Sequence, residues 1–160
     1  MKKHIWTRLV AALVVGAAWG MTAQCSAAMQ LRDALGHFES GATSPTRCPA
    51  DSKVGSRREV SRFQILPKVW RQYSKSPQYQ NPDVAWTVAE KVLTERHAWF
   101  TKATGREWDA VDLYLMWNAP AAYQNAKWDR RKVSRVVLER AQRFSNLFMR
   151  NETMLAQIGN

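Results

Sequence analysis

Apolar side chains recur every three or four residues along most of the chain, and this spacing predicts a mainly α-helical fold. We expect helices over residues 30–39, 65–73, 82–102, 108–117 and about 130–156. The segments between them are rich in Ser, Thr, Pro and basic residues, which is typical of loops. The pattern allows at most one small β-hairpin, near residues 54–60.

Several predicted helix ends carry clear signals. Asn81-Pro82 provides an N-cap and a first-turn proline, whereas Gly41 and Gly105 are typical stop residues. The segment 108–117 is apolar nearly all round, so we expect it at the centre of the core. Core positions are also expected for four tryptophans: Trp70, Trp86, Trp99 and Trp108.

The last predicted helix has an apolar stripe and a basic face. The apolar stripe consists of Val133, Val136, Val137, Phe144, Leu147 and Phe148. The basic face consists of Arg130, Arg131, Lys132, Arg135, Arg140 and Arg143. We expect the stripe to pack on the core and the arginines to face solvent.

The first 28 residues are typical of a secretory signal peptide. Lys2, Lys3 and Arg8 precede an apolar run from Leu9 to Trp19, which is too short to span a bilayer. Ser26-Ala27-Ala28 fits a small-residue cleavage site; cleavage after Ala23 and an uncleaved anchor are the alternatives. We therefore expect a periplasmic or secreted protein with no stable membrane insertion after cleavage.

The net charge of the chain bears on the kind of partner it binds. The 160 residues carry a formal charge of +11, which becomes +8 when the three basic residues of the signal peptide are removed. Residues 29–160 suffice for a single domain with one core. Such a surface favours an anionic partner, or is simply a solvated basic face; export and the lack of a nucleic-acid motif argue against nucleic acid.

Cysteine and histidine usage gives no metal-ligand pattern, so no metal is expected. The chemistry considered below needs no organic cofactor either. Cleavage after Ala28 would leave Cys48 as a lone thiol. Cleavage after Ala23 would let Cys25 and Cys48 form a disulfide.

Three short motifs follow one another in the chain: Phe38-Glu39-Ser40-Gly41, Glu59 to Pro67 (EVSRFQILP), and Trp117-Asn118-Ala119-Pro120. In order, spacing and helical setting they resemble the lysozyme-like domain of soluble lytic transglycosylases, which is related to goose-type lysozyme. The family has Glu-Ser, Gly-Leu-Met-Gln and Ala-Tyr-Asn-Ala-Gly at these places. Here Ser61, Arg62 and Phe63 stand for Gly, Leu and Met; Trp117 replaces Tyr and Pro120 replaces Gly.

The resemblance implies a lysozyme-like domain that cleaves peptidoglycan between N-acetylmuramic acid and N-acetylglucosamine. It assigns Glu39 as the catalytic acid and base, which protonates the leaving oxygen and then takes the proton of the muramic acid 6-hydroxyl. The product would be a 1,6-anhydro sugar. Such chemistry needs a carboxyl group whose pKa is raised, and an apolar helix end beside Phe38 can supply that setting.

Glu59 is the ambiguous carboxylate. A hydrolytic lysozyme benefits from a second carboxylate, and Glu59 could be that group. An ion pair with Arg57, Arg58 or Arg62 is the competing interpretation. Asp51 is a weaker candidate for the same role.

Substrate contacts are expected from six further residues: Ser40, Phe63, Gln64, Trp117, Asn118 and Tyr123. The Gln64 amide suits an N-acetyl group because it both donates and accepts. Trp117 and Tyr123 offer flat rings for stacking on sugars, although plain core packing is equally open for Trp117. Asn118 is expected to tie its helix end to the catalytic loop.

Two other functions stay open at this point. One is a hydrolytic lysozyme that uses Glu39 and Glu59. The other is a wall-binding protein without turnover, in which the fold is kept. A place beside an envelope-spanning assembly is a further option for a compact transglycosylase, although no residue of the sequence points to it directly.

Overall fold

The computed structural model describes residues 31–158, with side chains as far as residue 150, and it is mainly helical as predicted. The elements are a helix that includes residues 31–40, η1 (Pro49–Ser52), α2 (Pro67–Tyr73), α3 (Pro82–Thr104), α4 (Ala110–Asn118), α5 (Pro120–Asn125), η2 (Arg130–Lys132) and α6 (Arg135–Ile158). The predicted signal peptide, residues 1–28, lies outside the described residues. None of the described helices is long and apolar enough to cross a membrane.

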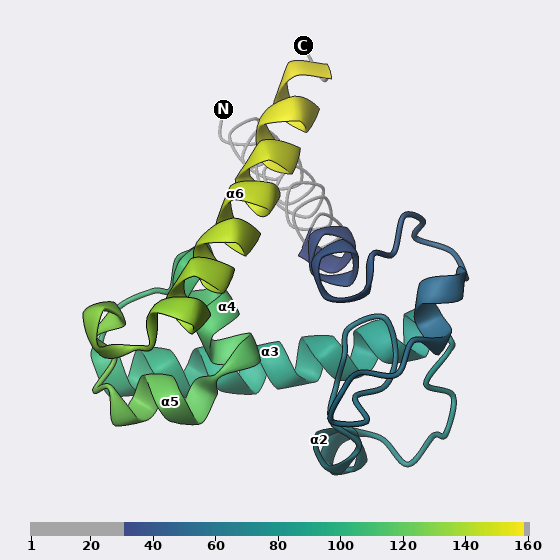
Figure 1. Cartoon of the computed structure of the whole chain (residues 1–160), viewed down its shortest axis with the longest axis horizontal. Coiled ribbons are helices and arrows are strands. Elements are labelled where there is room, and N and C mark those ends of the chain that lie inside the picture. Colours follow the sequence, from purple (N-terminus) through teal and green to yellow (C-terminus); the bar gives the residue numbers. More distant parts are fainter. Residues whose placement is uncertain (1–30, 159–160) are drawn as a thin grey trace, which may run out of the picture.

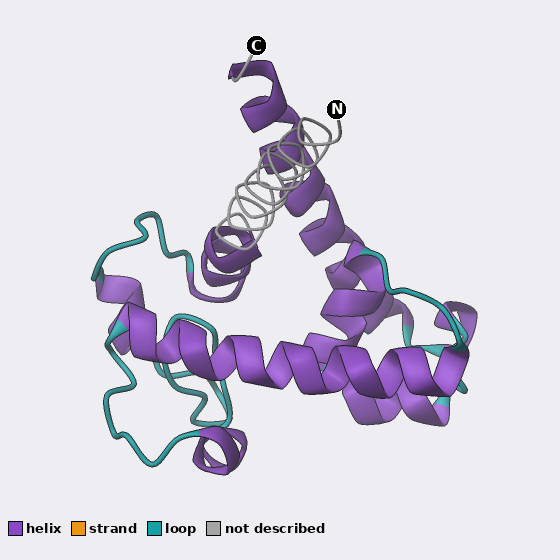
Figure 2. Cartoon of the chain, turned by 180° about the vertical axis from the view of Figure 1, so that it is seen from behind, coloured by secondary structure: helices purple, strands orange, loops and turns teal. Residues whose placement is uncertain are grey.

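Helix α3 is the long support on which the other elements lie (Figure 1, Figure 2). Its start is fixed by Asn81, whose side chain accepts hydrogen bonds from the backbone N–H groups of Asp83 and Val84. Its end is fixed by Gly105 in the left-handed conformation, at φ 70°. Both predicted boundary signals are therefore confirmed.

Helix α4 forms the centre of the core, also as predicted. It packs against α3, α5 and α6, and its residues from Leu113 to Met116 are buried. Asp109 caps its first turn by accepting from the N–H groups of Val111 and Asp112. Burying this apolar helix from several sides supplies much of the hydrophobic stabilisation of the fold.

The long segment between the first helix and α2 contains no strand and is held by one buried ion pair. Arg62 donates to both carboxylate oxygens of Asp51, at 2.6 and 2.9 Å. The same guanidinium donates to the carbonyls of Ser44 and Thr46, both at 2.6 Å. A planar group with five N–H donors can fasten several loop carbonyls at once, which an aliphatic side chain could not do.

Two predicted elements differ from the structure. The expected hairpin at residues 54–60 is a turn closed by a hydrogen bond from Gly55 N to Glu59 O, and the only bridge in the described chain joins Val60 to Ile65. The expected helix from Arg130 is split into η2 and α6. The split occurs because Val133 has an extended backbone and buries its side chain.

Three single positions also differ from the prediction. Val136 is 76% exposed although it belongs to the predicted apolar stripe. Arg140, placed on the predicted solvent face, instead reaches into the core side of α6 to bind Glu39. Trp99 is 36% exposed, whereas Trp70 is fully buried and Trp86 and Trp108 pack against the core as partly buried residues.

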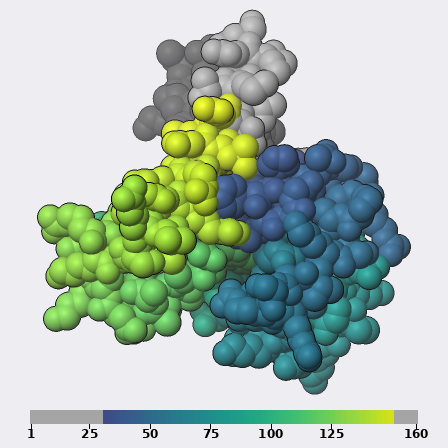
Figure 3. Space-filling model, in the orientation of Figure 1, coloured from purple at the N-terminus to yellow at the C-terminus, as the bar shows by residue number. Residues whose placement is uncertain are grey.

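The remaining feature of the fold is a hollow above α3. Helices α4, α5 and α6 gather at one end of α3, and α2 with the loop before it gathers at the other end (Figure 1). The space-filling view is indented between these two parts (Figure 3).

Candidate active site

A cleft of about 650 Å³ separates the two parts of the molecule. Its walls come from the first helix, the segment 55–66, α2, α3, the end of α4 and α6. Five of the predicted site residues line it together, namely Glu39, Glu59, Gln64, Trp117 and Asn118. Residues as far apart in sequence as Glu39 and Asn118 therefore share one cavity.

Glu39 lies in the last turn of the first helix and is nearly buried, with 7% of its side chain exposed. The helix ends there because Gly41, at φ 81°, donates its N–H to the carbonyl of His37. Phe38 packs edge-on against Tyr114 and Phe144, with ring centroids 5.0 and 5.6 Å apart. The carboxylate thus emerges from an apolar layer at the edge of the cleft.

Two side chains hold the Glu39 carboxylate. The hydroxyl of Tyr114 in α4 donates to Oε1 at 2.5 Å, and Nη2 of Arg140 in α6 donates to Oε2 at 3.1 Å. Arg140 Nε also donates to the Tyr114 hydroxyl oxygen at 2.7 Å, which closes a three-membered network. The network fixes the carboxylate in one orientation while leaving it beside the cavity.

Burial raises the pKa of Glu39, and the nearby Glu59 charge raises it further. The Tyr114 hydroxyl and the Arg140 guanidinium act in the opposite sense, but the pKa of Glu39 stays above its ordinary value of 4.5. A carboxyl group with a raised pKa retains its proton nearer to neutral pH. This is the property that a general acid needs.

Glu59 lies on the same cleft but in a different setting. Its Oε2 accepts from the Arg57 backbone N–H and its Oε1 from Arg57 Nε, both at 2.8 Å. Burial alone would raise the pKa of Glu59, yet these bonds and its own backbone N–H lower it overall. The ion pair with Arg57, one of the two predicted interpretations, is therefore present, and the carboxylate also faces the cavity.

Gly55 brings Glu59 and Gln64 together. A Cβ atom at Gly55 would collide with Glu59 Oε2 and would lie 2.5 Å from Gln64 Oε1. A side chain at this position would require Glu59 and Gln64 to move, because both side-chain oxygens lie against the Gly55 backbone. The Gln64 amide nitrogen donates to the carbonyls of Lys53 and Ser61, at 3.1 and 3.0 Å.

The turn from Ser61 to Gln64 is strained. Ser61 and Gln64 have φ values of 65° and 50°, a region that non-glycine residues rarely adopt. The buried Arg62–Asp51 pair and the Val60–Ile65 bridge hold the turn in place. Strain of this kind persists only where the surroundings enforce it, and it is common at functional sites.

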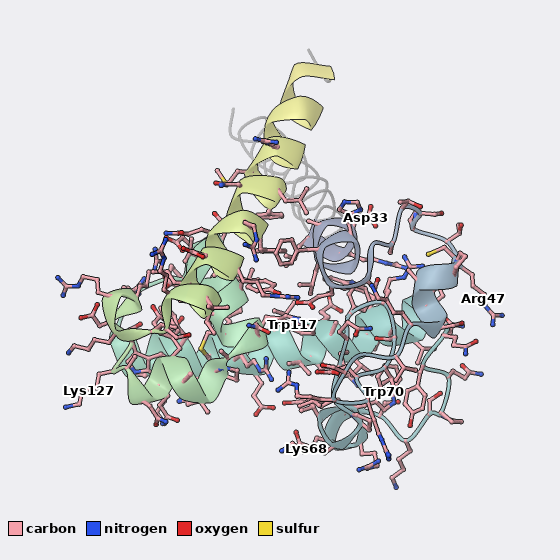
Figure 4. The ribbon with its side chains drawn as sticks, in the orientation of Figure 1. Asp33, Arg47, Lys68, Trp70, Trp117 and Lys127 are labelled. Carbon is pink, nitrogen blue, oxygen red and sulfur yellow. The ribbon has the colours of Figure 1, made fainter. Side chains whose placement is uncertain are left out.

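The end of α4 forms the wall opposite the segment 55–66. Trp117 is 9% exposed, so the ring is largely packed in the core but presents an edge to the cleft. Figure 4 shows Trp117 between the two parts of the molecule, above α3. Arg96 of α3 donates from Nη1 to the carbonyls of Met116 and Trp117, at 2.7 and 2.6 Å, and its guanidinium carbon lies 5.7 Å from the Trp117 ring centroid.

Three predicted substrate-binding residues do not line this cleft. Phe63 and Tyr123 are fully buried, because the Phe63 ring packs in the core and the Tyr123 hydroxyl donates to Asp112 at 2.6 Å. Ser40 is turned back onto its own helix, where its hydroxyl donates to the Gly36 carbonyl at 2.9 Å. For Asn118, no side-chain hydrogen bond to the catalytic loop occurs within the described chain. Asp51, the weaker carboxylate candidate, is occupied by Arg62.

Three residues of the site were not singled out from the sequence: Tyr114, Arg140 and Arg96. Tyr114 lies in a helix predicted to be core, and a buried tyrosine hydroxyl generally finds a polar partner. The sequence did hold a signal for Arg140. This residue lies four residues before the apolar Phe144, so helical spacing places both side chains on the inward side of α6. Within the described residues, no group of His, Cys, Asp and Glu could hold a metal ion.

No family model matches this chain, and neither the curated proteins nor the solved structures contain a significant match. The resemblance to the transglycosylase domain therefore rests on the three motifs themselves. Their arrangement around one cleft is an independent physical observation.

Proposed function

We propose that this chain is an exported lytic transglycosylase with a lysozyme-like domain, and that Glu39 is its catalytic residue. The observation that carries the proposal is the setting of Glu39: a nearly buried carboxyl group with a raised pKa, opening onto a 650 Å³ cleft. The cleft has the size of a small-molecule or oligosaccharide site. Gln64, Trp117 and Asn118 supply amide and ring surfaces of the kind that bind N-acetylated sugars.

Protonated Glu39 would donate its proton to the glycosidic oxygen as the bond from C1 of N-acetylmuramic acid breaks. The substrate's N-acetyl group would stabilise the positive charge that develops at C1. The Glu39 carboxylate would then take the proton of the C6 hydroxyl, whose oxygen bonds to C1 and closes the 1,6-anhydro ring. Glu39 ends protonated, as it began, and no water is consumed.

The backbone of the second motif supports this proposal. Ser61 stands where the family has glycine, and its φ of 65° is the conformation that favours glycine. Arg62 replaces the family's leucine and uses the position to fasten the preceding loop through Asp51. The departures from the family pattern therefore have structural counterparts and do not remove the catalytic carboxyl group.

A hydrolytic lysozyme is the second candidate, and the position of Glu59 favours it. The environments of Glu39 and Glu59 move their pKa values apart, one up and one down, as in an acid paired with an ionised carboxylate. Both oxygens of Glu59 are, however, engaged by Arg57. That occupation leaves little room to activate water, and it makes the single-carboxylate mechanism our preference.

Mass spectrometry of the products separates these functions. Purified protein and its Glu39→Gln variant are incubated with peptidoglycan sacculi, with Lys91→Gln as a control on an exposed part of α3. We expect 1,6-anhydro muropeptides from the parent and the control, and a loss of about 10²–10⁴-fold in rate for Glu39→Gln. Reducing-end products would identify a lysozyme, and Glu59→Gln would then be the next variant. Equal activity of Glu39→Gln would refute the assignment, whereas binding without products from either protein would indicate a wall binder.

A further inference from the structure

The charges that line the cleft are unequal. Four cationic side chains, Arg57, Lys68, Arg96 and Arg140, face two carboxylates. Arg57 is paired with Glu59 and Arg140 with Glu39. Within the described residues, neither Lys68 nor Arg96 forms an ion pair.

Arg96 is a partly buried cation that forms no ion pair with any carboxylate of the described residues. Burial lowers the pKa of Arg96, which reflects the cost of keeping its charge away from water. The carbonyls of Met116 and Trp117 engage only its Nη1 atom. Glu95 acts on Arg96 through space, but its carboxylate accepts a hydrogen bond from Tyr73 at 2.5 Å.

Lys68 approaches the same cavity from α2, which packs against α3. It is exposed and lies on α2, whereas Trp117 lies at the end of α4 (Figure 4). An anion between Lys68 and Arg96 would meet two cations from two different helices. Charge-assisted hydrogen bonds of this kind are among the stronger polar contacts in proteins.

We propose that Lys68 and Arg96 form a carboxylate subsite at the α2 end of the cleft. This inference rests on the proposed function, because the glycan would then lie along the cleft past Glu39. The ligand is a free carboxylate of the peptide attached to the muramic acid. The chain accordingly prefers glycan that carries peptides with free carboxylates over amidated or peptide-free glycan.

Binding by an inactive protein tests the subsite separately from catalysis. In a Glu39→Gln background, calorimetry compares a disaccharide-peptide muropeptide with the same compound after amidation of its carboxylates. Lys68→Gln and Arg96→Gln are each expected to weaken binding of the free acid by about tenfold and to leave the amidated form unchanged. Lys91→Gln, an exposed charge removal on α3, is expected to change the dissociation constant by less than about twofold, because screened surface charges contribute little.

Two binding results would overturn the subsite, and a third result concerns Arg96 alone. One is equal affinity of the parent for the free and amidated compounds. The other is an equal loss in Lys91→Gln, which would indicate the general field of a basic protein. Arg96 also caps the end of α4, so the Tm of each variant is measured beside its titration. If Arg96→Gln lowers the Tm and weakens binding of the free and the amidated compound equally, Arg96 has a structural role only. That result also counts against the subsite. Failure of the glycan cleavage assay leaves this binding comparison intact, so the two proposals fail independently.

Discussion

Glu39 and Asp112 are both buried carboxylates held by tyrosine and arginine side chains, yet their pKa values move in opposite directions. Glu39 receives one tyrosine hydroxyl and one guanidinium, and its pKa is raised. Asp112 receives the hydroxyl of Tyr123 and the guanidinium groups of Arg106 and Arg130. Burial opposes the ionisation of Asp112 too, but these partners outweigh it and lower its pKa to about 2.

The difference lies in how completely each charge is neutralised. Asp112 is fully buried and forms ion pairs with two arginines, at 2.5 and 2.6 Å. Glu39 has a single guanidinium partner at 3.1 Å, and that side chain is 40% exposed. A satisfied carboxylate serves as a fixed part of the fold, whereas an incompletely satisfied one at a cavity can exchange a proton.

The largest expected loss of stability comes from removing the charge of Asp112. Asp112→Asn would leave Arg106 and Arg130 facing a neutral amide, and we expect a loss of about 3–4 kcal/mol in the free energy of unfolding. Urea denaturation at neutral pH measures it. Because the folded pKa of Asp112 is lowered to about 2, the stabilisation is present above its ordinary value of 3.8 and is lost as pH falls toward 2. The difference between parent and variant should therefore shrink over that window.

Asp83→Asn is the control, since Asp83 forms an exposed ion pair with Arg32. Such surface pairs contribute less than about 1 kcal/mol. If both variants lost the same stability, Asp112 would not be the structural carboxylate that its burial and its two ion pairs indicate.

An intermediate effect is expected at Arg140, the one cation that holds Glu39. Arg140→Gln removes a charge that favours ionised Glu39, so the pKa of Glu39 should rise further and the alkaline limb of the activity profile should move to higher pH. We expect an unfolding cost of about 1–2 kcal/mol, because the lost hydrogen bonds are charge-assisted but partly exposed. The dependence of kcat/KM on pH gives the readout.

Arg143→Gln is the matched variant on the exposed face of α6 and should leave the limb in place. A limb that moves to lower pH in Arg140→Gln would contradict the assigned direction. The raised pKa of Glu39 also affects stability. As pH rises above 4.5, Glu39 ionises more readily in the unfolded chain than in the folded one, so the free energy of unfolding falls.

The smallest expected losses of stability come from removing one of two tyrosine hydroxyl groups. Tyr114→Phe removes the hydrogen bond to Glu39, and Tyr123→Phe removes the one to Asp112. Each should cost about 1 kcal/mol of stability, since the rings keep their aromatic contacts. Only Tyr114→Phe should raise the pKa of Glu39, the proposed catalytic group, and alter the pH profile. A profile altered equally by Tyr123→Phe would show that the two networks are coupled.

The helices were predictable because their signals are local. Asn81-Pro82 and Gly105 fix the ends of α3 through backbone geometry and hydrogen bonds within a few residues. The apolar segment of α4 could only be stable inside a core. The helix predicted from Arg130 failed at Val133, because the extended backbone of that residue overrode the periodic pattern.

The site was predictable only in part. Glu39, Gln64 and Trp117 were found through motifs, but Phe63 and Tyr123 were misplaced because an aromatic ring suits a core and a sugar cleft equally well. Arg140 was assigned to solvent because helical spacing does not reveal which arginine has a buried acceptor nearby. The role of Arg62 depends on Asp51 and on carbonyls eleven to eighteen residues away.

By itself the sequence determined where helices begin and end, which segment forms the core, and which carboxylate to suspect. Only the tertiary structure decided that Glu39 has a raised pKa while Asp112 has a lowered one. It also decided that two cations of the cleft have no ion-pair partner among the described residues. The physical reason is the distance along the chain over which each interaction acts. Capping and periodicity act over one or two turns, whereas burial and charge depend on side chains that distant helices bring within a few ångströms.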